Sequence, residues 1–221
     1  MPDPTSRLAN IRDQMASAAK SARRDLGDVT LIAVTKTHSV DEIAPLIAAG
    51  QRDFGESRVQ EAQAKWPDLR DCYPDIRLHL IGRLQSNKAA EAVALFDTIH
   101  SLDRPSLLTT LVTAAERAER FPAVYVQVNI GEEEQKGGVA IADLPTLLEA
   151  VRASPLPLAG LMAIPPIGPE AAPYFALLAK LAKRHGVAGL SMGMSGDYQS
   201  AIKLGATAVR VGSALFEDIA S

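Results

Sequence analysis

The feature that most constrains the fold is a regular alternation of short apolar runs and helical patterns along the chain. Eight strand-like runs occur, and nearly all are separated by a helical pattern. The first run, Thr30–Val34, is apolar and partly β-branched, which is typical of a buried strand. Eight such units joined by short loops favour a single closed (β/α)8 TIM barrel over an open sheet. An open doubly wound sheet would normally show a G-x-G-x-x-G turn after the first strand, and this sequence has none there.

An extra helix is expected before the first strand, because Leu8, Ile11 and Met15 recur at helical spacing. The predicted strands cover 30–34, 52–54, 76–81, 98–102, 124–130, 158–164, 187–192 and 206–211, and the later helices cover 40–49, 57–69, 87–95, 104–119, 143–152, 169–185 and 196–203. No repeat, low-complexity tract or Pro/Gly/Ser linker divides the chain. We therefore expect one domain over 1–221, with an N-terminal helix within 1–25 packed on the barrel.

Composition excludes several classes of protein. With 23 basic and 26 acidic residues the net charge is −3, which argues against a partner that is nucleic acid or an anionic membrane. The single cysteine, Cys72, excludes intramolecular disulfides and a cysteine-cluster metal site, and it fits a reducing compartment. The polar N-terminus is unlike a signal peptide, and no apolar stretch has membrane-spanning length. A cytoplasmic location is the expectation.

In a barrel of this kind the chemistry lies at the carboxyl ends of the strands, and the first strand ends close to Lys36. Ile32, Val34 and Lys36 share one strand face, so Lys36 would point into the barrel mouth if the other two fill its interior. Partial desolvation there would favour the neutral amine, which can attack a carbonyl and form a Schiff base. The alternative, a lysine that extends past the strand end into solvent, remains open from position alone.

The loops after the last two strands predict a phosphate site. Ser195 follows the seventh strand as a potential N-cap of the next helix, and Gly212 and Ser213 follow the eighth. Glycine lets backbone N–H groups approach an anion, and a serine hydroxyl can donate to it. Either loop alone fits ordinary helix capping. Together, at the strand ends where barrels commonly bind phosphate, they favour a phosphate ligand.

Arg210 shares its strand face with Ala208 and Gly212, so it also would point inward. A reactive lysine, a phosphate site and an inward arginine together describe a pocket for pyridoxal phosphate, with Arg210 facing the ring nitrogen. A cation at that position disfavours protonation of the nitrogen, which makes the ring a poor electron sink. This arrangement suits a protein that holds or carries the cofactor better than a fast transaminase.

Six segments resemble one known family. They are Ala33–Thr37, Phe54–Glu61, His79–Lys88, Gly160–Met162, Leu190–Ser195 and Val209–Phe216. Together they are similar to the pyridoxal phosphate homeostasis protein family, over nearly the whole chain from about residue 29. The resemblance implies a barrel similar to the N-terminal domain of alanine racemase and a cofactor held covalently on Lys36. It implies a role in intracellular supply of pyridoxal phosphate, with no established catalytic turnover.

The resemblance also assigns residues and partners. The phosphate would be held by Ser195, Gly212 and Ser213, and Arg210 would face the pyridine nitrogen. Gly193 and Met194 are further candidates for binding the cofactor, Met194 through its backbone N–H near the phosphate. Partners would be pyridoxal phosphate itself and pyridoxal-phosphate-dependent enzymes as recipients of the cofactor, with no nucleic acid and no membrane. Three positions depart from the family pattern: Ser57 stands where asparagine is usual, Arg83 where histidine is frequent, and His38 where a second lysine is frequent. The departure at Ser57 puts a ring-side hydrogen bond in doubt.

Two other functions remain as alternatives. An amino-acid racemase needs a base on each face of the substrate carbon, and one lysine supplies only one of them. Alanine racemases add a β-rich domain with a catalytic tyrosine, which we expect this chain to lack. A Schiff-base aldolase normally has its lysine on a later strand, and an acid–base carboxylate or tyrosine should accompany that lysine. Glu56 is the carboxylate candidate; we expect it instead to begin the second barrel helix, where the helix dipole favours its charge.

The remaining prominent residues receive structural interpretations. His79 is expected to be a hydrogen-bonded core histidine, and Met162, Met192 and Met194 are expected to pack in the upper barrel. Trp66 is expected to begin the break after the helix that follows the second strand, and Cys72 to lie in a loop. Lys136 is expected to be a solvated charge in a mobile loop, the alternative being a residue that relays the cofactor.

Overall fold

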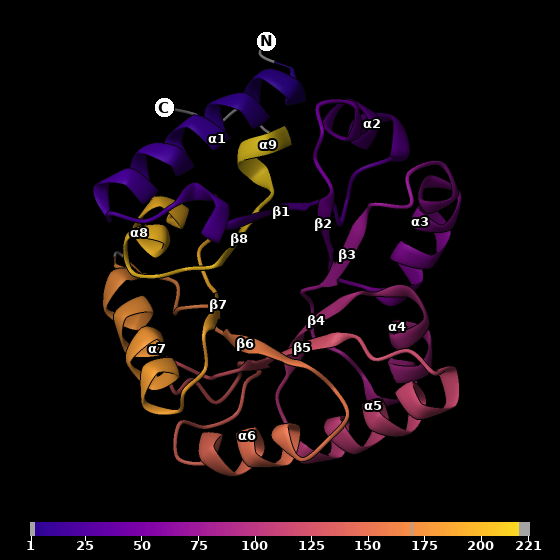
Figure 1. The fold of residues 1–221 in the computed structure, drawn as a ribbon, viewed down its shortest axis with the longest axis vertical. Helices are drawn as coiled ribbons and strands as arrows, with labels where there is room; N and C mark the ends of the chain where they lie inside the picture. Colours follow the sequence, from indigo (N-terminus) through magenta and orange to yellow (C-terminus); the bar gives the residue numbers. More distant parts are fainter. Residues whose placement is uncertain (1–2, 169, 217–221) are drawn as a thin grey trace.

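The computed structural model describes residues 3–168 and 170–216. Eight parallel strands form a closed barrel in the order β1 to β8, with helices around it (Figure 1). The strands are β1 (Thr30–Val34), β2 (Asp53–Glu56), β3 (Arg77–Leu80), β4 (Thr98–Leu102), β5 (Ala123–Gln127), β6 (Leu158–Met162), β7 (Gly189–Ser191) and β8 (Ala208–Val211). The helices are α1 (Pro4–Ser21), α2 (Val40–Ala48), α3 (Val59–Cys72), α4 (Ala89–Leu95), α5 (Pro105–Ala118), α6 (Leu144–Arg152), α7 (Ala172–Arg184), α8 (Tyr198–Lys203) and α9 (Ser213–Phe216). The predicted TIM barrel with an additional N-terminal helix is confirmed.

Several strands are shorter than the sequence predicts. β5 ends at Gln127 and β6 at Met162, although both apolar patterns continue further along the chain. Beyond β5, Val128 forms an isolated bridge with Val139 instead of extending the ladder. These residues are apolar because they pack beneath the loops at the carboxyl end of the barrel, and Val128, Ile130 and Val139 are all buried. Hydrophobicity alone therefore overestimates strand length here.

The N-terminal helix α1 lies against α8, α9 and α2, on the side of the barrel where β8 meets β1 (Figure 1). Its predicted apolar positions Leu8, Ile11 and Met15 are buried. Arg12 on its flank donates to the carbonyl of Ala49 and to Gln51 Oε1, both at 3.2 Å. The helix thus covers the apolar surface at the barrel seam and is also held to the α2–β2 connection by polar contacts.

Helix α3 extends further than expected, and the prediction that Trp66 begins a break is wrong. The helix continues through Pro67 to Cys72, with Trp66 fully buried in its middle. Pro67 removes one backbone hydrogen bond, to the carbonyl of Gln63, which lies on the exposed side where water can replace it. Packing of Trp66 against Phe54, with ring centroids 4.9 Å apart, holds the helix on the barrel. Cys72 is the exposed last residue of α3 and does not lie in a loop.

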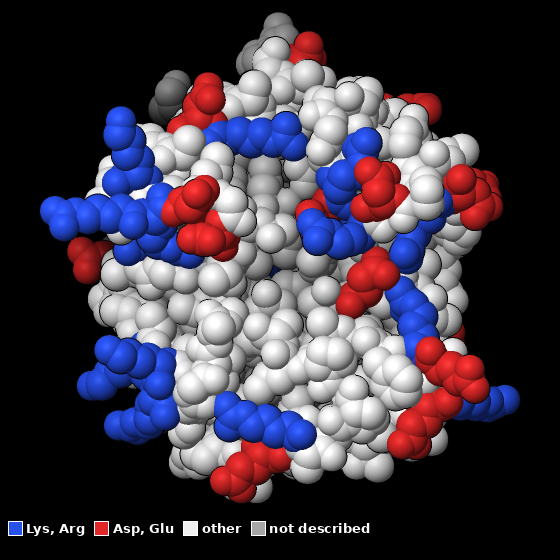
Figure 2. All heavy atoms as spheres, viewed as in Figure 1, with Lys and Arg blue, Asp and Glu red and all other residues white. Residues whose placement is uncertain are grey.

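Charged side chains on the face shown in Figure 2 lie mainly over the outer helices, and the middle of that face is mostly uncharged. Acidic and basic groups are interspersed there without a large region of one sign. Among the described helices, none is long and apolar enough to cross a bilayer.

Candidate functional site

A cavity of about 650 Å³ lies at the carboxyl ends of the strands. Its size is within the range of small-molecule sites, and its position is where barrels place their chemistry. It is lined by Val34, Lys36, Ser57, Ile81, Gly82, Arg83, Gln127, Gly137, Ile164, Met194, Ser195, Gly196, Arg210, Gly212 and Ser213. Seven of the eight residues predicted to bind a cofactor are in this set; the eighth, Gly193, directly precedes Met194.

The charges around the cavity favour an anionic ligand. Lys36, Arg83 and Arg210 contribute to its wall, and none of the described residues lining it is Asp or Glu. Three basic side chains in a wall without a carboxylate attract an anion and would repel a cationic ligand.

Lys36 lies in the turn after β1, and the backbone just before it is firmly held. Thr35 is fully buried; its hydroxyl donates to Glu56 Oε1 at 2.8 Å, and its carbonyl accepts from Lys65 Nζ at 2.7 Å. The Lys36 side chain itself is exposed, so the expected partial desolvation is not found. The reason is its location two residues beyond the strand, at the rim of the barrel rather than among its interior side chains.

The prediction that Glu56 begins a helix is wrong. Glu56 is the last residue of β2 and is fully buried. Its Oε1 accepts from Lys65 Nζ and Trp66 Nε1 of α3, both at 2.9 Å, in addition to Thr35. Because its side chain faces α3, Glu56 is not part of the cavity wall and does not supply the carboxylate that an aldolase would need.

The loops after β7 and β8 meet at Ser195. Its Oγ accepts from the backbone N–H of Gly212 at 3.1 Å and of Ala214 at 3.3 Å. Ser195 is therefore not the N-cap of α8, as the sequence suggested; that position belongs to Asp197. The loops after β7 and β8, which the sequence predicts to form one site, are therefore in contact. The backbone N–H groups of Gly212 and Ala214 converge on one oxygen atom at the cavity wall.

Gly193 and Met194 shape the loop that carries Ser195. Gly193 has a φ of 94°, and a Cβ on it would lie 2.6 Å from the Cβ of Ala201, so another residue would be strained and would clash. The Met194 N–H donates to Asp197 Oδ1 at 2.6 Å, which closes the turn. The Met194 side chain is 40% exposed, so its predicted packing in the upper barrel is wrong, whereas Met162 and Met192 are fully buried as expected.

Arg210 points inward from β8, as predicted, and is 4% exposed. Its Nη1 donates to Ser191 Oγ at 2.5 Å and its Nη2 to the carbonyl of Ala163 at 3.0 Å. Burial lowers the pKa of Arg210 to about 10, which still leaves the side chain cationic at neutral pH. A rigid, buried cation thus lies in the wall of the cavity.

His79 is a hydrogen-bonded core histidine, as expected. Its Nε2 lies 2.9 Å from Asp53 Oδ1 and its Nδ1 lies 3.1 Å from His100 Nε2. Sequence reasoning missed His100 and Ser191, which connect His79 to Arg210. The available signal was a polar residue at the end of the apolar seventh strand: Ser191 is the last residue of β7, next to the loop that carries Ser195.

Other residues of interest lie around the cavity rim. Ser57 and Arg83, both departures from the family pattern, line the cavity. His38 stacks on Phe216 with ring centroids 3.7 Å apart. Lys136 is half-buried; its Nζ donates to the carbonyl of Pro165 at 3.1 Å and lies 2.5 Å from Glu133 Oε2. The expectation of a simply solvated Lys136 is therefore wrong, because the loop folds back over its amine.

A second cavity, of about 720 Å³, lies outside the barrel between α1 and the start of α8. It shares Ser195 and Gly196 with the first cavity but contains neither Lys36 nor Arg210. The combination of a rim lysine, a buried arginine and converging backbone donors favours the cavity at the strand ends as the candidate functional site. No group of His, Cys, Asp or Glu suited to a metal ion occurs within the described parts of the chain.

Comparison with known proteins agrees with this geometry. The family "Alanine racemase, N-terminal domain" matches residues 7–219. A "Pyridoxal phosphate homeostasis protein" of Deinococcus radiodurans is 43% identical, covering 95% of this chain and 97% of that protein. One of the same name from Pseudomonas aeruginosa is 41% identical, covering 95% and 93%. The solved structure of PipY from Synechococcus elongatus with PLP bound matches with a TM-score of 0.78 and 40% identity, covering 91% of this chain and 99% of PipY. The chain therefore belongs to the alanine racemase N-terminal domain family and, within it, to the pyridoxal phosphate homeostasis proteins.

Proposed function

We propose that this protein binds pyridoxal 5'-phosphate, holds it as a Schiff base on Lys36 and serves in the homeostasis of the cofactor. The observation that carries the proposal is the meeting of Lys36, Arg210 and the Ser195–Gly212 contact around one cavity of about 650 Å³. The names of the relatives and the PLP bound to PipY support the same ligand.

The donors around the cavity fit the chemical groups of this cofactor. Pyridoxal phosphate carries a phosphate, an aldehyde and a ring nitrogen. The N–H groups of Gly212 and Ala214 already converge on the Ser195 oxygen, an arrangement that also suits a phosphate oxygen. Lys36 supplies the primary amine that an aldehyde requires, and the basic wall suits the phosphate charge.

Each residue then has a defined task. Ser195, Gly212 and Ser213 hold the phosphate, with Gly193 and Met194 fixing the conformation of the loop, while Lys36 binds the aldehyde carbon. Arg210 is assigned to the ring nitrogen, and Ser57 to the side of the ring. When bound, pyridoxal phosphate supplies an aldehyde that condenses with primary amines and a ring that can withdraw electrons.

We further propose that the protein holds the cofactor without catalytic turnover. A permanently charged Arg210 at the ring nitrogen opposes its protonation and weakens electron withdrawal. A racemase would need a second base, and the described residues lining the cavity include no Tyr, His or carboxylate. An aldolase is disfavoured by the orientation of Glu56 toward α3.

The proposed partners are pyridoxal-phosphate-dependent enzymes that receive the cofactor. The exposed position of Lys36 supports transfer, because an incoming amine can reach the attached carbon from solvent. A cytoplasmic location forms part of the proposal, and the single Cys72 is consistent with that reducing compartment.

The experiment is an absorption spectrum of purified protein with pyridoxal phosphate, comparing wild type, Lys36→Ala and the control Lys203→Ala, an exposed residue at the end of α8. Wild type and Lys203→Ala are expected to show a band in the violet region that borohydride bleaches, leaving a peptide adduct at Lys36 in mass spectrometry. Lys36→Ala is expected to lack both. Incubation of loaded protein with D- or L-alanine is expected to give no racemisation.

A wild-type protein that stays colourless with added cofactor contradicts the binding proposal. An adduct on a different lysine contradicts the assignment of Lys36, and racemised alanine contradicts the absence of turnover.

A further inference from the structure

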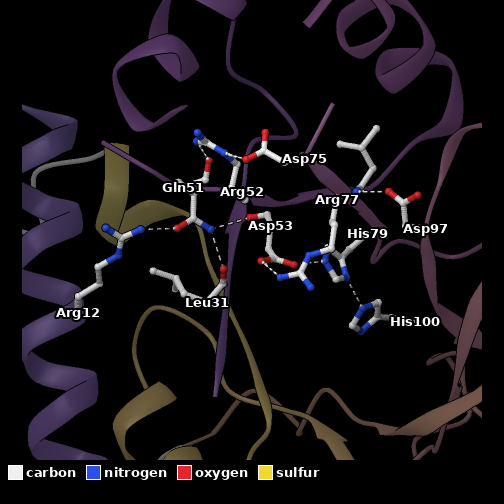
Figure 3. A network of polar contacts seen from close by, with 11 residues as sticks. Arg12, Leu31, Gln51, Arg52, Asp53, Asp75, Arg77, His79, Asp97 and His100 are labelled. Carbon is white, nitrogen blue, oxygen red and sulfur yellow. Dashed lines mark hydrogen bonds and ion pairs between the residues drawn. The ribbon is translucent and has the colours of Figure 1, made fainter. Parts of the chain in front are cut away.

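A chain of hydrogen bonds crosses the interior of the barrel from one end to the other. It begins at Arg210 near the carboxyl ends of the strands and continues through Ser191, His100 and His79 to Asp53 at the amino end of β2. The successive distances are 2.5 Å from Arg210 Nη1 to Ser191 Oγ, 2.8 Å from Ser191 Oγ to His100 Nδ1, 3.1 Å from His100 Nε2 to His79 Nδ1, and 2.9 Å from His79 Nε2 to Asp53 Oδ1. Figure 3 shows the part of this chain from Asp53 to His100.

One continuous direction of donation satisfies the groups at both ends of this series of hydrogen bonds. A guanidinium only donates hydrogen bonds, and a carboxylate only accepts them. Ser191 Oγ accepts from Arg210, so its own proton is available for His100 Nδ1. His100 then donates from Nε2 to His79 Nδ1, and His79 donates from Nε2 to Asp53. In this direction each histidine accepts at Nδ1 and donates from Nε2, and each of the three residues between Arg210 and Asp53 both accepts and donates.

The groups packed around the histidines stabilise this assignment. Burial, with added repulsion from Arg210, holds the pKa of His100 well below its usual range, so its ring is neutral. Tyr125 of β5 stacks on the His100 ring with centroids 4.4 Å apart. At the other end, burial alone would raise the pKa of Asp53, but hydrogen bonds from His79 and Arg77 outweigh it and the net shift is downward. Arg77 of β3 donates to Asp53 Oδ2 at 2.7 Å.

We propose that Ser191, His100 and His79 are positioning residues that orient Arg210 in the cavity through this directional relay, with the Asp53–Arg77 pair as its fixed end. The relay connects the buried cation of the candidate cofactor site to the opposite end of the barrel. Its effect on the cofactor rests on the proposed function, whereas its proton arrangement is a property of the protein alone.

The relay matters because the Arg210 guanidinium makes two hydrogen bonds to the described residues, and one of them is the bond to Ser191. The other acceptor, the carbonyl of Ala163, leaves the guanidinium free to rotate about that single contact if Ser191 loses its orientation. We therefore expect disruption of the relay to weaken cofactor binding by roughly tenfold, the scale of one hydrogen bond to a charged group.

The first test uses the protein without cofactor. In ¹⁵N NMR of the histidine side chains, His79 and His100 of the wild type are expected to show the neutral Nε2–H tautomer at pH 7. In Asp53→Asn the amide can donate to His79 Nε2, so the chain can reverse and the Nδ1–H tautomer of His79 is expected to appear. His185, outside the barrel interior, serves as the internal reference in both proteins.

The second test measures the affinity and the absorption band of added pyridoxal phosphate. Ser191→Ala and His100→Phe, which keeps an aromatic ring against Tyr125, are expected to lose about tenfold in affinity and to shift the band. His185→Gln is expected to match the wild type. Far-UV circular dichroism shows whether each variant is folded, and the wild-type NMR result stands even if His100→Phe is not.

The outcomes separate the two proposals. The relay is overturned if His79 or His100 of the wild type gives an imidazolium or Nδ1–H signal. It is also overturned if the histidine tautomers of Asp53→Asn match those of the wild type. Cofactor binding in Ser191→Ala and His100→Phe equal to that of His185→Gln overturns the positioning role and leaves the proposed function intact. Failure of the wild type to bind pyridoxal phosphate, with the NMR result as expected, contradicts the proposed function and leaves the proton arrangement intact.

Discussion

At the residue scale, the buried carboxylate of Glu56 connects the rim of the barrel to its outer layer. One oxygen atom, Oε1, accepts from Thr35 of the β1 end and from Lys65 and Trp66 of α3. Oε2 is buried and has no hydrogen-bond partner. A buried charge is tolerated only when it is paired, and here the side-chain amine of Lys65, 12% exposed, supplies the counter-charge. The group fixes the backbone directly before Lys36.

Glu56→Gln tests this role. The substitution keeps the shape of the side chain but leaves the largely buried amine of Lys65 without its counter-charge. We expect the free energy of unfolding to fall by about 2–4 kcal/mol. Urea unfolding measures it, with Glu61→Gln as the control, since Glu61 pairs only with the exposed Arg58 and should change stability by less than about 0.5 kcal/mol. Equal midpoints for the two variants would show that Glu56 has no structural role.

At the element scale, helix α2 begins with a capping box immediately after the turn that carries Lys36. Ser39 Oγ accepts from the Glu42 N–H at 3.4 Å, and Glu42 Oε2 accepts from the Ser39 N–H at 2.8 Å. His38 Nδ1 lies 3.0 Å from Glu42 Oε1. The box satisfies donors that a helix start otherwise leaves unpaired, and it fixes where the Lys36 turn ends.

These contacts hold the pKa of Glu42 at about 2, mainly through the His38 hydrogen bond and then through those of Ser39. Since this pKa lies below the ordinary value of 4.5, the stability that Glu42 contributes is complete above about pH 4.5 and is lost as the pH falls toward 2. A ¹³C NMR titration of the carboxyl group measures the pKa directly. Ser39→Ala is expected to raise it, whereas Ser21→Ala, whose hydroxyl bonds a carbonyl in α1, should leave it unchanged. An unchanged pKa of Glu42 in Ser39→Ala would show that the capping box does not lower that pKa.

At the scale of the whole molecule, α1 joins segments that are far apart in the sequence. Arg12 reaches the α2–β2 connection, and Tyr198 of α8 donates to Gln14 Oε1 at 2.6 Å. Arg24, just after the helix, donates to the carbonyl of Ile202 at 2.8 Å. Because α8 follows the loop that carries Ser195, packing of α1 supports the proposed phosphate site from behind.

Leu8→Ala tests this packing. Leu8 is 1% exposed, so its truncation removes buried apolar contacts and leaves a cavity between α1 and its neighbours. We expect a loss of about 2–4 kcal/mol in the free energy of unfolding, measured by urea denaturation. Ser17→Ala, on the exposed face of α1, is the matched control and should lie within about 0.5 kcal/mol of the wild type. A Leu8→Ala protein as stable as the control would mean that α1 contributes little to the barrel.

The sequence was sufficient for the architecture and for the candidate residues that lie at the strand ends. The alternation of apolar runs and helical patterns determines a barrel, because each strand must be buried by a helix on its outer side and by the other strands within. Lys36, Arg210 and the loops at Ser195 and Gly212 follow from that architecture, since parallel strands bring their carboxyl ends to the same edge. Lys36, Ser195 and Gly212 could be named from their positions after a strand, and Arg210 from the face it occupies within β8.

Only the tertiary structure decided which polar residues meet inside the barrel, between the carboxyl and amino ends of its strands. Asp53, His79, His100 and Ser191 belong to four different strands, and each looks like an isolated polar residue in the sequence. Closure of the barrel in one register brings them into a single hydrogen-bonded chain, and registers between distant strands are not encoded in local periodicity. The same holds for Glu56: its partners in α3 exist only because that helix packs across the end of β2. Local pattern determined which elements form, and contact between elements determined which polar groups are satisfied.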